Sequence, residues 1–252
     1  MRSLKLTLAY DGARYAGWQV QPDQPTVQQA LERALTKITG ETIRTCASGR
    51  TDAGVHALGQ VVSLETDSRL SPNVLRRALC AELREDIAVL AVEEVAEGFH
   101  AIRDALAKRY RYEIDDGPVR DVFRRHYTWQ HPGRLSAEAM HAAGQALVGK
   151  HDFASFESSG SERATTVRTI TELFVRRGEG EGTDRITTEV AADGFLYNMV
   201  RAIVGTLVEV GRGARSESWP AEVLAARDRS RAGPTAPPQG LFLVRVEYKA
   251  GR

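Results

Sequence analysis

The order of strand and helix patterns in the first hundred residues most constrains the fold. Alternating apolar residues from Leu4 to Tyr10 predict a half-buried strand that ends at Asp11-Gly12. A Thr26–Gln29 capping box then opens a helical pattern that stops at Gly40. Further patterns follow as strand, strand, helix and strand at 42–47, 55–64, 72–79 and 87–95. This β-α-β-β-α-β order is typical of a ferredoxin-like fold.

The same order recurs in the second part of the chain, without any repeat in the sequence itself. Strand patterns lie at 109–114, 167–176, 186–192 and 241–248, and helical patterns at 136–147, 195–210 and 219–227. We therefore predict an α+β protein of two ferredoxin-like halves, residues 1–105 and 106–252. Their mainly antiparallel strands could merge into one shared sheet. A cleft at the junction of the halves is where we expect a ligand to bind.

Composition excludes several classes of protein. The 252 residues are 42% hydrophobic and 27% charged, which is ordinary for a globular chain and unlike a disordered one. The most apolar stretch, from Phe195 to Val210, is interrupted by charged and polar residues, so we expect no membrane span. The N-terminus lacks the apolar run of a signal peptide. With only two cysteines, Cys46 and Cys80, we expect a cytoplasmic protein without a disulfide framework.

The near-neutral net charge of +1 conceals an excess of arginine. Of the 34 basic residues, five are lysines and 29 are arginines. They gather at 108–111, 120–125 and 227–231, whereas acidic residues gather elsewhere. Such separation is compatible with a basic groove that contacts RNA phosphates. The codon usage of a GC-rich genome is an alternative explanation for the arginines.

One glycine-rich loop holds the most suggestive chemistry. No phosphate-binding loop, dinucleotide fingerprint, zinc-protease motif or serine-hydrolase elbow is present, so the classes of enzyme that depend on them lose their usual support. The segment Ser48–Ala57 lies between two predicted strands and presents a single carboxylate, Asp52, between Gly49 and Gly54. The structural alternative is an Asx turn in which Asp52 caps backbone amides and pairs with Arg50.

The string Gly-Arg-Thr-Asp-Ala-Gly-Val-His-Ala in this loop resembles the signature of the tRNA pseudouridine synthase A family. Similar blocks follow one another along nearly the full chain. They are Tyr10–Gln19, Phe99–Ala101, Lys108–Tyr112, Lys150–Phe156, Thr166–Ile170, Gly194–Gly205 and Thr235–Leu243. One departure is that Ile102 precedes Arg103 where many relatives read Phe-x-Ala-Arg, so Arg103 receives no role here.

The resemblance implies an isomerase that converts uridine to pseudouridine in the tRNA anticodon stem-loop, at positions 38, 39 and 40, without cofactor or metal. It implies the pseudouridine synthase fold with a central RNA-binding cleft, and a homodimer that binds tRNA. By position in the motifs, Asp52 is the catalytic aspartate. Tyr110 packs against the target base, Arg201 pairs with the aspartate, Leu241 lines the pocket, and Arg50 helps to hold the target nucleotide out of the stack.

The residues leave two questions open. Asp52 could act as a nucleophile or as a general base, and the sequence does not separate these routes. The rival functions are a non-catalytic RNA-binding module, and a small-molecule enzyme that uses Asp52 and His56 as acid and base. Each residue also has a structural alternative: Tyr110 and Leu241 as core residues, and Arg201 as a surface arginine that extends its charge to water.

Overall fold

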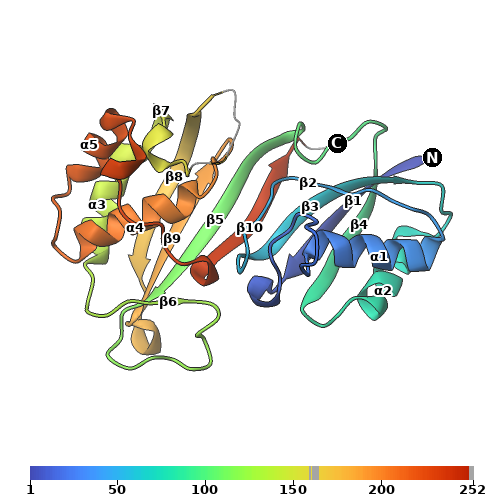
Figure 1. The fold of residues 1–252 in the computed structure, drawn as a ribbon, viewed down its shortest axis with the longest axis horizontal. Helices are drawn as coiled ribbons and strands as arrows, with labels where there is room; N and C mark the ends of the chain where they lie inside the picture. Colours follow the sequence, from blue (N-terminus) through green and yellow to red (C-terminus); the bar gives the residue numbers. More distant parts are fainter. Residues whose placement is uncertain (159, 161–164, 250–252) are drawn as a thin grey trace. The chain divides into compact units, whose positions relative to one another are not determined.

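In the computed structural model, residues 1–158, 160 and 165–249 are described. The chain divides into two compact units (Figure 1). Unit 1 comprises Met1–Lys108 and the C-terminal segment that begins at Phe242, and unit 2 comprises Arg109–Leu241. The closing strand groups with the N-terminal unit because it pairs in parallel with the strand that follows the Asp52 loop, Phe242 opposite His56. The sequence division at residue 105 had placed this strand in the second half.

Unit 1 has the strand order of a ferredoxin-like fold. Its elements are β1 (Arg2–Tyr10), α1 (Val27–Thr39), β2 (Cys46–Ala47), β3 (His56–Thr66), α2 (Pro72–Glu82), β4 (Ile87–Val95) and β10 (Leu241–Tyr248). The strands are ordered β4-β1-β3, with β2 and β10 also paired to β3. Strand β1 is antiparallel to both β3 and β4. The predicted β-α-β-β-α-β arrangement is confirmed here, although the strand expected over 42–47 pairs only at Cys46–Ala47.

Local sequence signals explain the first helix of unit 1. The Thr26 side chain accepts a hydrogen bond from the amide of Gln29, as the capping box predicts, and Gly40 ends α1 in the left-handed conformation with a φ of 75°. The core is built from leucines that alternate on β1 and recur with helical spacing on α1 and α2. Those with no exposed surface are Leu4, Leu6, Leu8, Leu31, Leu35, Leu75 and Leu79.

The strands of unit 2 follow the order β5-β9-β8-β7, and β8 is antiparallel to both β7 and β9. The elements of this unit are β5 (Ala105–Asp115), β6 (Trp129–Gln130), α3 (Ala137–Gly144), β7 (Gly149–Asp152), β8 (Val167–Arg177), β9 (Arg185–Ala192), α4 (Met199–Gly211) and α5 (Trp219–Ala226). The helix expected from Phe195 begins only at Met199, because Asn198 adopts a left-handed conformation with a φ of 60°. Nearly all of α4 is buried, and it packs against α3.

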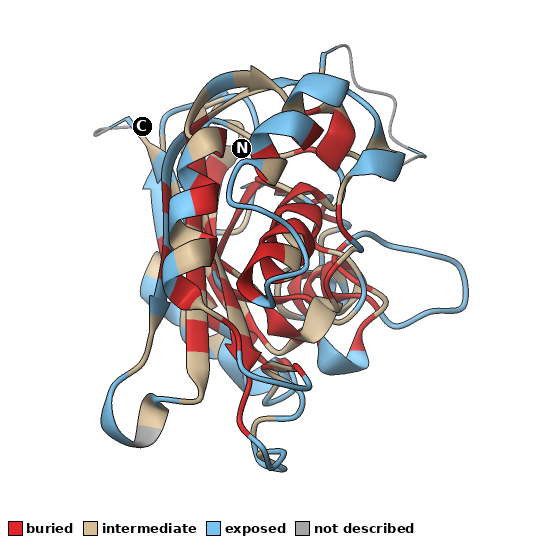
Figure 2. Cartoon of the chain, turned by 90° about the vertical axis from the view of Figure 1, so that its left-hand side faces the viewer, coloured by how far each residue is buried: buried red, intermediate tan, exposed pale blue. Residues whose placement is uncertain are grey.

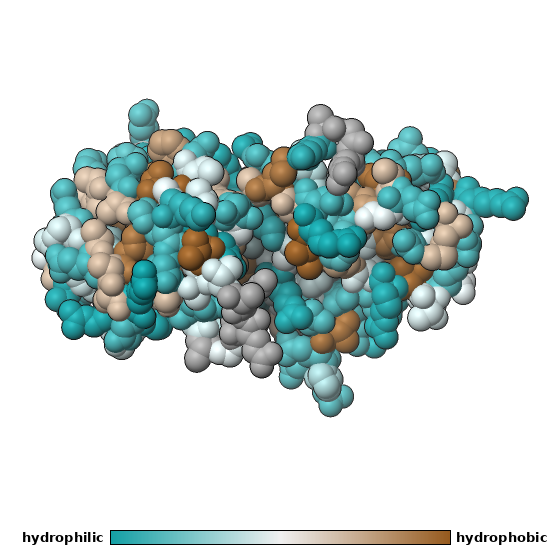
Figure 3. Space-filling view, turned by 90° about the horizontal axis from the view of Figure 1, so that it is seen from above, coloured by the Kyte–Doolittle hydropathy of each residue, from teal (hydrophilic) through white to brown (hydrophobic). Residues whose placement is uncertain are grey.

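Burial follows the secondary structure (Figure 2). Buried residues gather in the strands and on the inner faces of the helices, and most exposed residues lie in the connecting loops. The face seen in Figure 3 is mainly hydrophilic, with small and separate apolar patches. Among the described residues, no helix combines the length and apolar character needed to cross a membrane.

Candidate active site

The Asp52 loop of unit 1 connects β2 to β3 and is fixed by its own backbone. The amide of Ser48 donates to the carbonyl of Val61 at 2.8 Å, and the amide of Trp18 donates to the carbonyl of Thr51 at 3.0 Å. The amide of Val55 closes the turn onto the carbonyl of Asp52 at 3.1 Å. Asp52 itself is half-buried and Arg50 is exposed. The loop therefore presents both side chains from a firmly held turn.

The segment from Tyr10 to Trp18 supports this loop at close range. A Cβ on Gly12 would lie 2.0 Å from the carbonyl oxygen of Val55, and one on Gly17 would lie 2.5 Å from that of Thr51. Gly17 also has a φ of 98°, which favours glycine. The Tyr10 hydroxyl lies 2.8 Å from Thr51 Oγ1. The segment Tyr10–Trp18 thus positions the Asp52 loop, a role that the sequence alone does not reveal.

His56 at the end of the loop has a structural role. Its ring is 1% exposed and stacks on Phe242 with 4.7 Å between ring centroids. Its Nδ1 lies 3.1 Å from the amide of Gly12 and 3.1 Å from Asp11 Oδ1. A ring buried in this way ties the loop to β10 and to the Asp11 turn. This placement disfavours the small-molecule enzyme in which His56 serves as acid or base.

Lys108 positions the Asp52 loop. The sequence shows that Lys108 belongs to the Lys108–Tyr112 block but does not reveal this role. The Nζ of Lys108 donates to the carbonyl of Ser48 at 2.5 Å. The buried Gln60 reinforces the same turn, because its Nε2 donates to the carbonyl of Gly49 at 2.8 Å and its Oε1 accepts from Ser48 Oγ at 2.7 Å. The basic side chain is thus engaged with the Asp52 loop.

Three predicted site residues lie in unit 2. Tyr110 on β5 is 8% exposed and packs edge-to-face on Phe195, with 5.0 Å between ring centroids. Leu241, at the start of β10, is 6% exposed. Arg201 on α4 is half-buried, and its Nε donates to the carbonyl of Ala236 at 2.7 Å. A second guanidinium nitrogen donates to Asn198 Oδ1 at 2.7 Å. Arg201 is therefore partly buried and held by protein groups, which disfavours the surface alternative.

Tyr112 connects these parts of unit 2. It is fully buried, and its hydroxyl donates to the carbonyl of Pro237 at 2.7 Å. A Cβ on Gly240 would lie 2.7 Å from the Tyr112 ring, so the segment before Leu241 rests directly on this ring. Burial raises the pKa of Tyr112 far above its ordinary value despite the opposing charge of Arg201, which keeps the hydroxyl a neutral donor. Unit 2 thus assembles Arg201 and the 235–241 segment around one buried ring.

Gly205 sets the distance between α4 and this segment, which gives a testable prediction. A Cβ at Gly205 would lie 1.7 Å from the carbonyl oxygen of Pro234, a backbone atom that cannot turn aside. We expect Gly205→Ala to lower the free energy of unfolding by about 1–3 kcal/mol. It also shifts Ala236, which accepts from Arg201. Urea unfolding measures the loss. Gly182→Ala, whose Cβ would meet only Arg185 at 3.6 Å or more, is the control and should change stability by less than about 0.5 kcal/mol.

Comparison with known proteins identifies the family. A family model described as tRNA pseudouridine synthase matches residues 7–103 and 143–249. Proteins named tRNA pseudouridine synthase A are similar over nearly their whole length. That of Moorella thermoacetica is 49% identical, with 98% of this chain and 100% of the relative covered. That of Brevibacillus brevis is 47% identical with the same coverage, and that of Myxococcus xanthus is 45% identical, with 100% and 94% covered.

Similarity to solved structures is more distant. A crystal structure of the archaeal box H/ACA sRNP Nop10-Cbf5 complex matches 81% of this chain with a TM-score of 0.35 and 10% identity. A Cbf5-Nop10-Gar1 complex matches 81% with a TM-score of 0.36 and 12% identity. The chain spans 43% and 54% of the length of those two proteins.

The sequence comparisons define the class as RNA-modifying isomerases, which agrees with the α+β architecture of both units. The chain belongs to the tRNA pseudouridine synthase family. It is an isomerase of tRNA uridine, and its fold is the pseudouridine synthase fold, as the motifs predicted. The matched segments contain Asp52, Arg50, Arg201 and Leu241, whereas Tyr110 lies between them.

Proposed function

We propose that this chain converts uridines 38, 39 and 40 of the tRNA anticodon stem-loop to pseudouridine, with Asp52 as the catalytic residue. The observation that carries the proposal is the loop with a single carboxylate. This loop is held by hydrogen bonds from the Trp18 amide and Lys108 and by one to the carbonyl of Val61. The reaction breaks the bond between uracil N1 and the sugar, rotates the base and joins C5 to the sugar. C5 then loses its proton to solvent, and N1 takes up a proton in its place. The reaction needs no oxidant and no phosphoryl donor.

Each residue has a proposed role in this reaction. The Asp52 carboxylate attacks as a nucleophile or removes a proton as a general base, and both routes need one ionised acid beside the nucleotide. Arg201 pairs with that carboxylate and opposes the cost of burying its charge. The Tyr110 ring packs against the uracil, and Leu241 supplies an apolar wall. Because extruding a base from a folded stem-loop costs a few kcal/mol, Arg50 assists by holding the nucleotide outside the stack.

The wider setting is part of the same proposal. The partner is tRNA, bound in a central cleft of a cytoplasmic homodimer. The relatives are named as tRNA enzymes, which supports tRNA as the partner. The anticodon arm is what the resemblance of the motifs implies. The cytoplasmic location follows from the presence of tRNA there. Gel filtration with light scattering measures the dimer directly, and a monomer at micromolar concentration would refute that part of the proposal.

The substrate positions can be tested with a set of transcripts. Unmodified tRNAs are prepared with uridine at 38, 39 or 40 in turn, and with cytidine at all three positions as the control. After incubation with the chain alone, pseudouridine is mapped along the RNA. We expect product at each of the three positions and none in the control. Product confined to another arm of the tRNA would contradict the assignment to the anticodon arm.

Binding of tRNA should depend strongly on salt, but less than the number of arginines suggests. Arg109 pairs with Glu172 at 2.5 Å, and Arg111 pairs with Glu189 at 2.9 Å, so their charges are largely neutralised within unit 2. Each phosphate contact contributes about 0.7–0.9 to the slope of log affinity against log salt. We expect a clear negative slope from 50 to 300 mM salt, measured by filter binding. A flat dependence would contradict a basic RNA-binding surface.

A further inference from the structure

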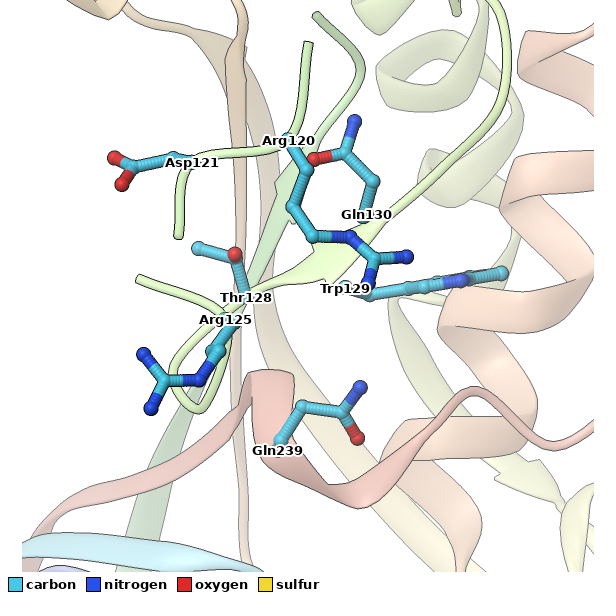
Figure 4. A pocket seen from close by; sticks show the side chains of 7 residues that line it. All are labelled: Arg120, Asp121, Arg125, Thr128, Trp129, Gln130 and Gln239. Carbon is cyan, nitrogen blue, oxygen red and sulfur yellow. The ribbon is translucent and has the colours of Figure 1, made fainter. Parts of the chain in front are cut away.

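Unit 2 contains a small pocket beside the start of β10 that the proposed mechanism does not use (Figure 4). Its volume is about 170 Å³, and it is lined by Arg120, Trp129, Gln239 and four neighbouring residues. We propose that this pocket binds one unstacked base of the substrate RNA next to the target uridine. In this arrangement the base stacks on Trp129 and its phosphate contacts Arg120. The inference rests on the proposed function and deepens it.

The Trp129 ring is held in place before any ligand arrives. Strand β6 pairs in parallel with β5, and Trp129 lies opposite Ile114. The indole packs edge-to-face on Tyr112, with 6.3 Å between ring centroids, and on His131, with 5.5 Å. Trp129 nevertheless remains partly exposed. A fixed aromatic surface of this kind costs little ordering on binding and suits a base of any identity.

Polar and charged groups surround this ring. In Figure 4 the guanidinium of Arg120 lies beside the Trp129 ring, and the Gln239 amide points toward the same space. Arg120 is exposed. Asp121, the one acid in the lining, points away from the ring, and its Oδ1 accepts from the amides of Phe123 and Arg124 at 2.9 and 3.2 Å. The pocket therefore offers positive charge toward an anion.

The pocket adjoins the candidate catalytic wall within unit 2. Gln239 lies two residues before Leu241, in a single turn over Pro238–Gly240. Tyr112 contacts both sites, because its ring packs on Trp129 and its hydroxyl donates to the carbonyl of Pro237. Tyr110 is two residues away on the same strand and so shares the face of Tyr112. A nucleotide that neighbours the target base along the RNA would therefore reach this pocket.

The size of the pocket selects the ligand. Pockets that enclose a drug-sized molecule measure roughly 300–1,000 Å³, so about 170 Å³ accommodates one flat group. The loop over 117–128 forms the wall of the pocket and is held by hydrogen bonds within residues 117–130. Gln130 Nε2 donates to the carbonyl of Gly117 at 3.0 Å, and Thr128 Oγ1 donates to that of Arg124 at 3.1 Å. A preformed pocket of this size fits a single base better than a protein segment.

The loop that forms the wall also exposes apolar side chains among its arginines. Phe123 is 87% exposed and Val119 is 79% exposed. Residues 104–142 lie outside the two segments that the family model matches. The wall and the Trp129 surface thus belong to a stretch that this model does not match. Exposed rings beside arginines are suited to unstacked bases with their phosphates.

Binding of unmodified tRNA by Trp129 and Arg120 variants tests the inference. Trp129→Ala should weaken the affinity roughly 5- to 150-fold, the effect of removing one base-stacking ring, with the salt slope unchanged. Trp129→Phe should retain most of the affinity. Arg120→Ala should lower the salt slope by about 0.7–0.9. Arg77→Ala, an exposed arginine on α2, is the matched control and should leave affinity and slope as they are. Thermal unfolding confirms that each variant is folded.

An abasic scan of the RNA identifies the occupant. Removing the base at one nucleotide beside the target uridine should weaken binding to the parent chain but not to Trp129→Ala, because the lost contact is shared. The inference would be overturned if every abasic site weakened binding to the parent and to Trp129→Ala by the same factor. It would also be overturned if Trp129→Ala bound the intact tRNA as tightly as the parent. A change in the association of protomers without any change in tRNA affinity would have the same consequence. Pseudouridine formation by the parent chain separates this failure from failure of the proposed function.

Discussion

Replacing Asp52 with asparagine should nearly abolish pseudouridine formation while leaving tRNA bound. The change removes the negative charge and the basicity of one side chain, and a positioned catalytic group of this kind contributes about 10²–10⁴-fold to the rate. The amide is nearly the same size, and the turn is closed by the backbone carbonyl of residue 52, which accepts from Val55. The measurement is the single-turnover rate of pseudouridine formation beside the dissociation constant for the same transcript.

A second carboxylate provides the control for this comparison. Asp23 lies exposed in a turn with a φ of 55°, a conformation that asparagine also adopts. Asp23→Asn should therefore leave both the rate and the affinity unchanged. A non-catalytic RNA-binding module predicts that Asp52→Asn behaves like Asp23→Asn. Undiminished product from Asp52→Asn would support that rival function and remove Asp52 from the reaction.

Removing the Asp116 carboxylate should cause the largest loss of stability from a single polar substitution. Its side chain has no exposed surface, and both of its carboxylate oxygens accept hydrogen bonds from the protein. Arg177 donates to both oxygens at 2.7 and 2.9 Å, Arg134 donates at 3.2 Å, and the amide of Leu135 donates at 2.9 Å. Asp116→Ala leaves Arg177, which is 17% exposed, without its main partner. We expect a loss of about 3–5 kcal/mol in the free energy of unfolding, measured with urea.

The same carboxylate gives a pH dependence whose sign follows from its surroundings. Burial opposes ionisation, but the hydrogen bonds and charges of Arg177, Leu135 and Arg134 together hold the pKa of Asp116 below its ordinary value of 3.8. A group with a lowered pKa stabilises the fold above the unfolded pKa, and this contribution is lost as the pH falls through the folded pKa. Asp116→Asn should therefore show a smaller loss of stability than the parent between pH 5 and pH 2. Parallel curves for the two proteins would contradict this.

Local signals were sufficient to predict most of unit 1. The Thr26 cap, the Gly40 stop and the alternation from Leu4 to Tyr10 act within a few residues, so they are visible in the sequence. The short strands β6 and β7 escaped prediction because two and four residues are too few to show a period. The start of α4 was also predicted too early, because the apolar run from Phe195 continues through a left-handed Asn198.

The candidate site was predictable where its motif is contiguous. Asp52 and Arg50 lie in one loop, and the family resemblance predicts Tyr110, Arg201 and Leu241, which stay predictions. The supports of the Asp52 loop were not predictable, because they join distant segments through backbone atoms. Lys108 reaches the carbonyl of Ser48, and Gly12 faces that of Val55. The pocket beside Trp129 likewise combines 120–130 with Gln239, a pairing that only the folded chain reveals.

A crystal structure of the chain bound to an anticodon stem-loop with an intact target uridine is the most direct test of the Asp52 assignment. Asp52→Asn serves to trap the unreacted complex. We predict that residue 52 contacts the sugar or base of the extruded uridine, with Tyr110 against the uracil ring and Leu241 beside it. A uridine held elsewhere, with residue 52 turned away from the nucleotide, would contradict the proposal.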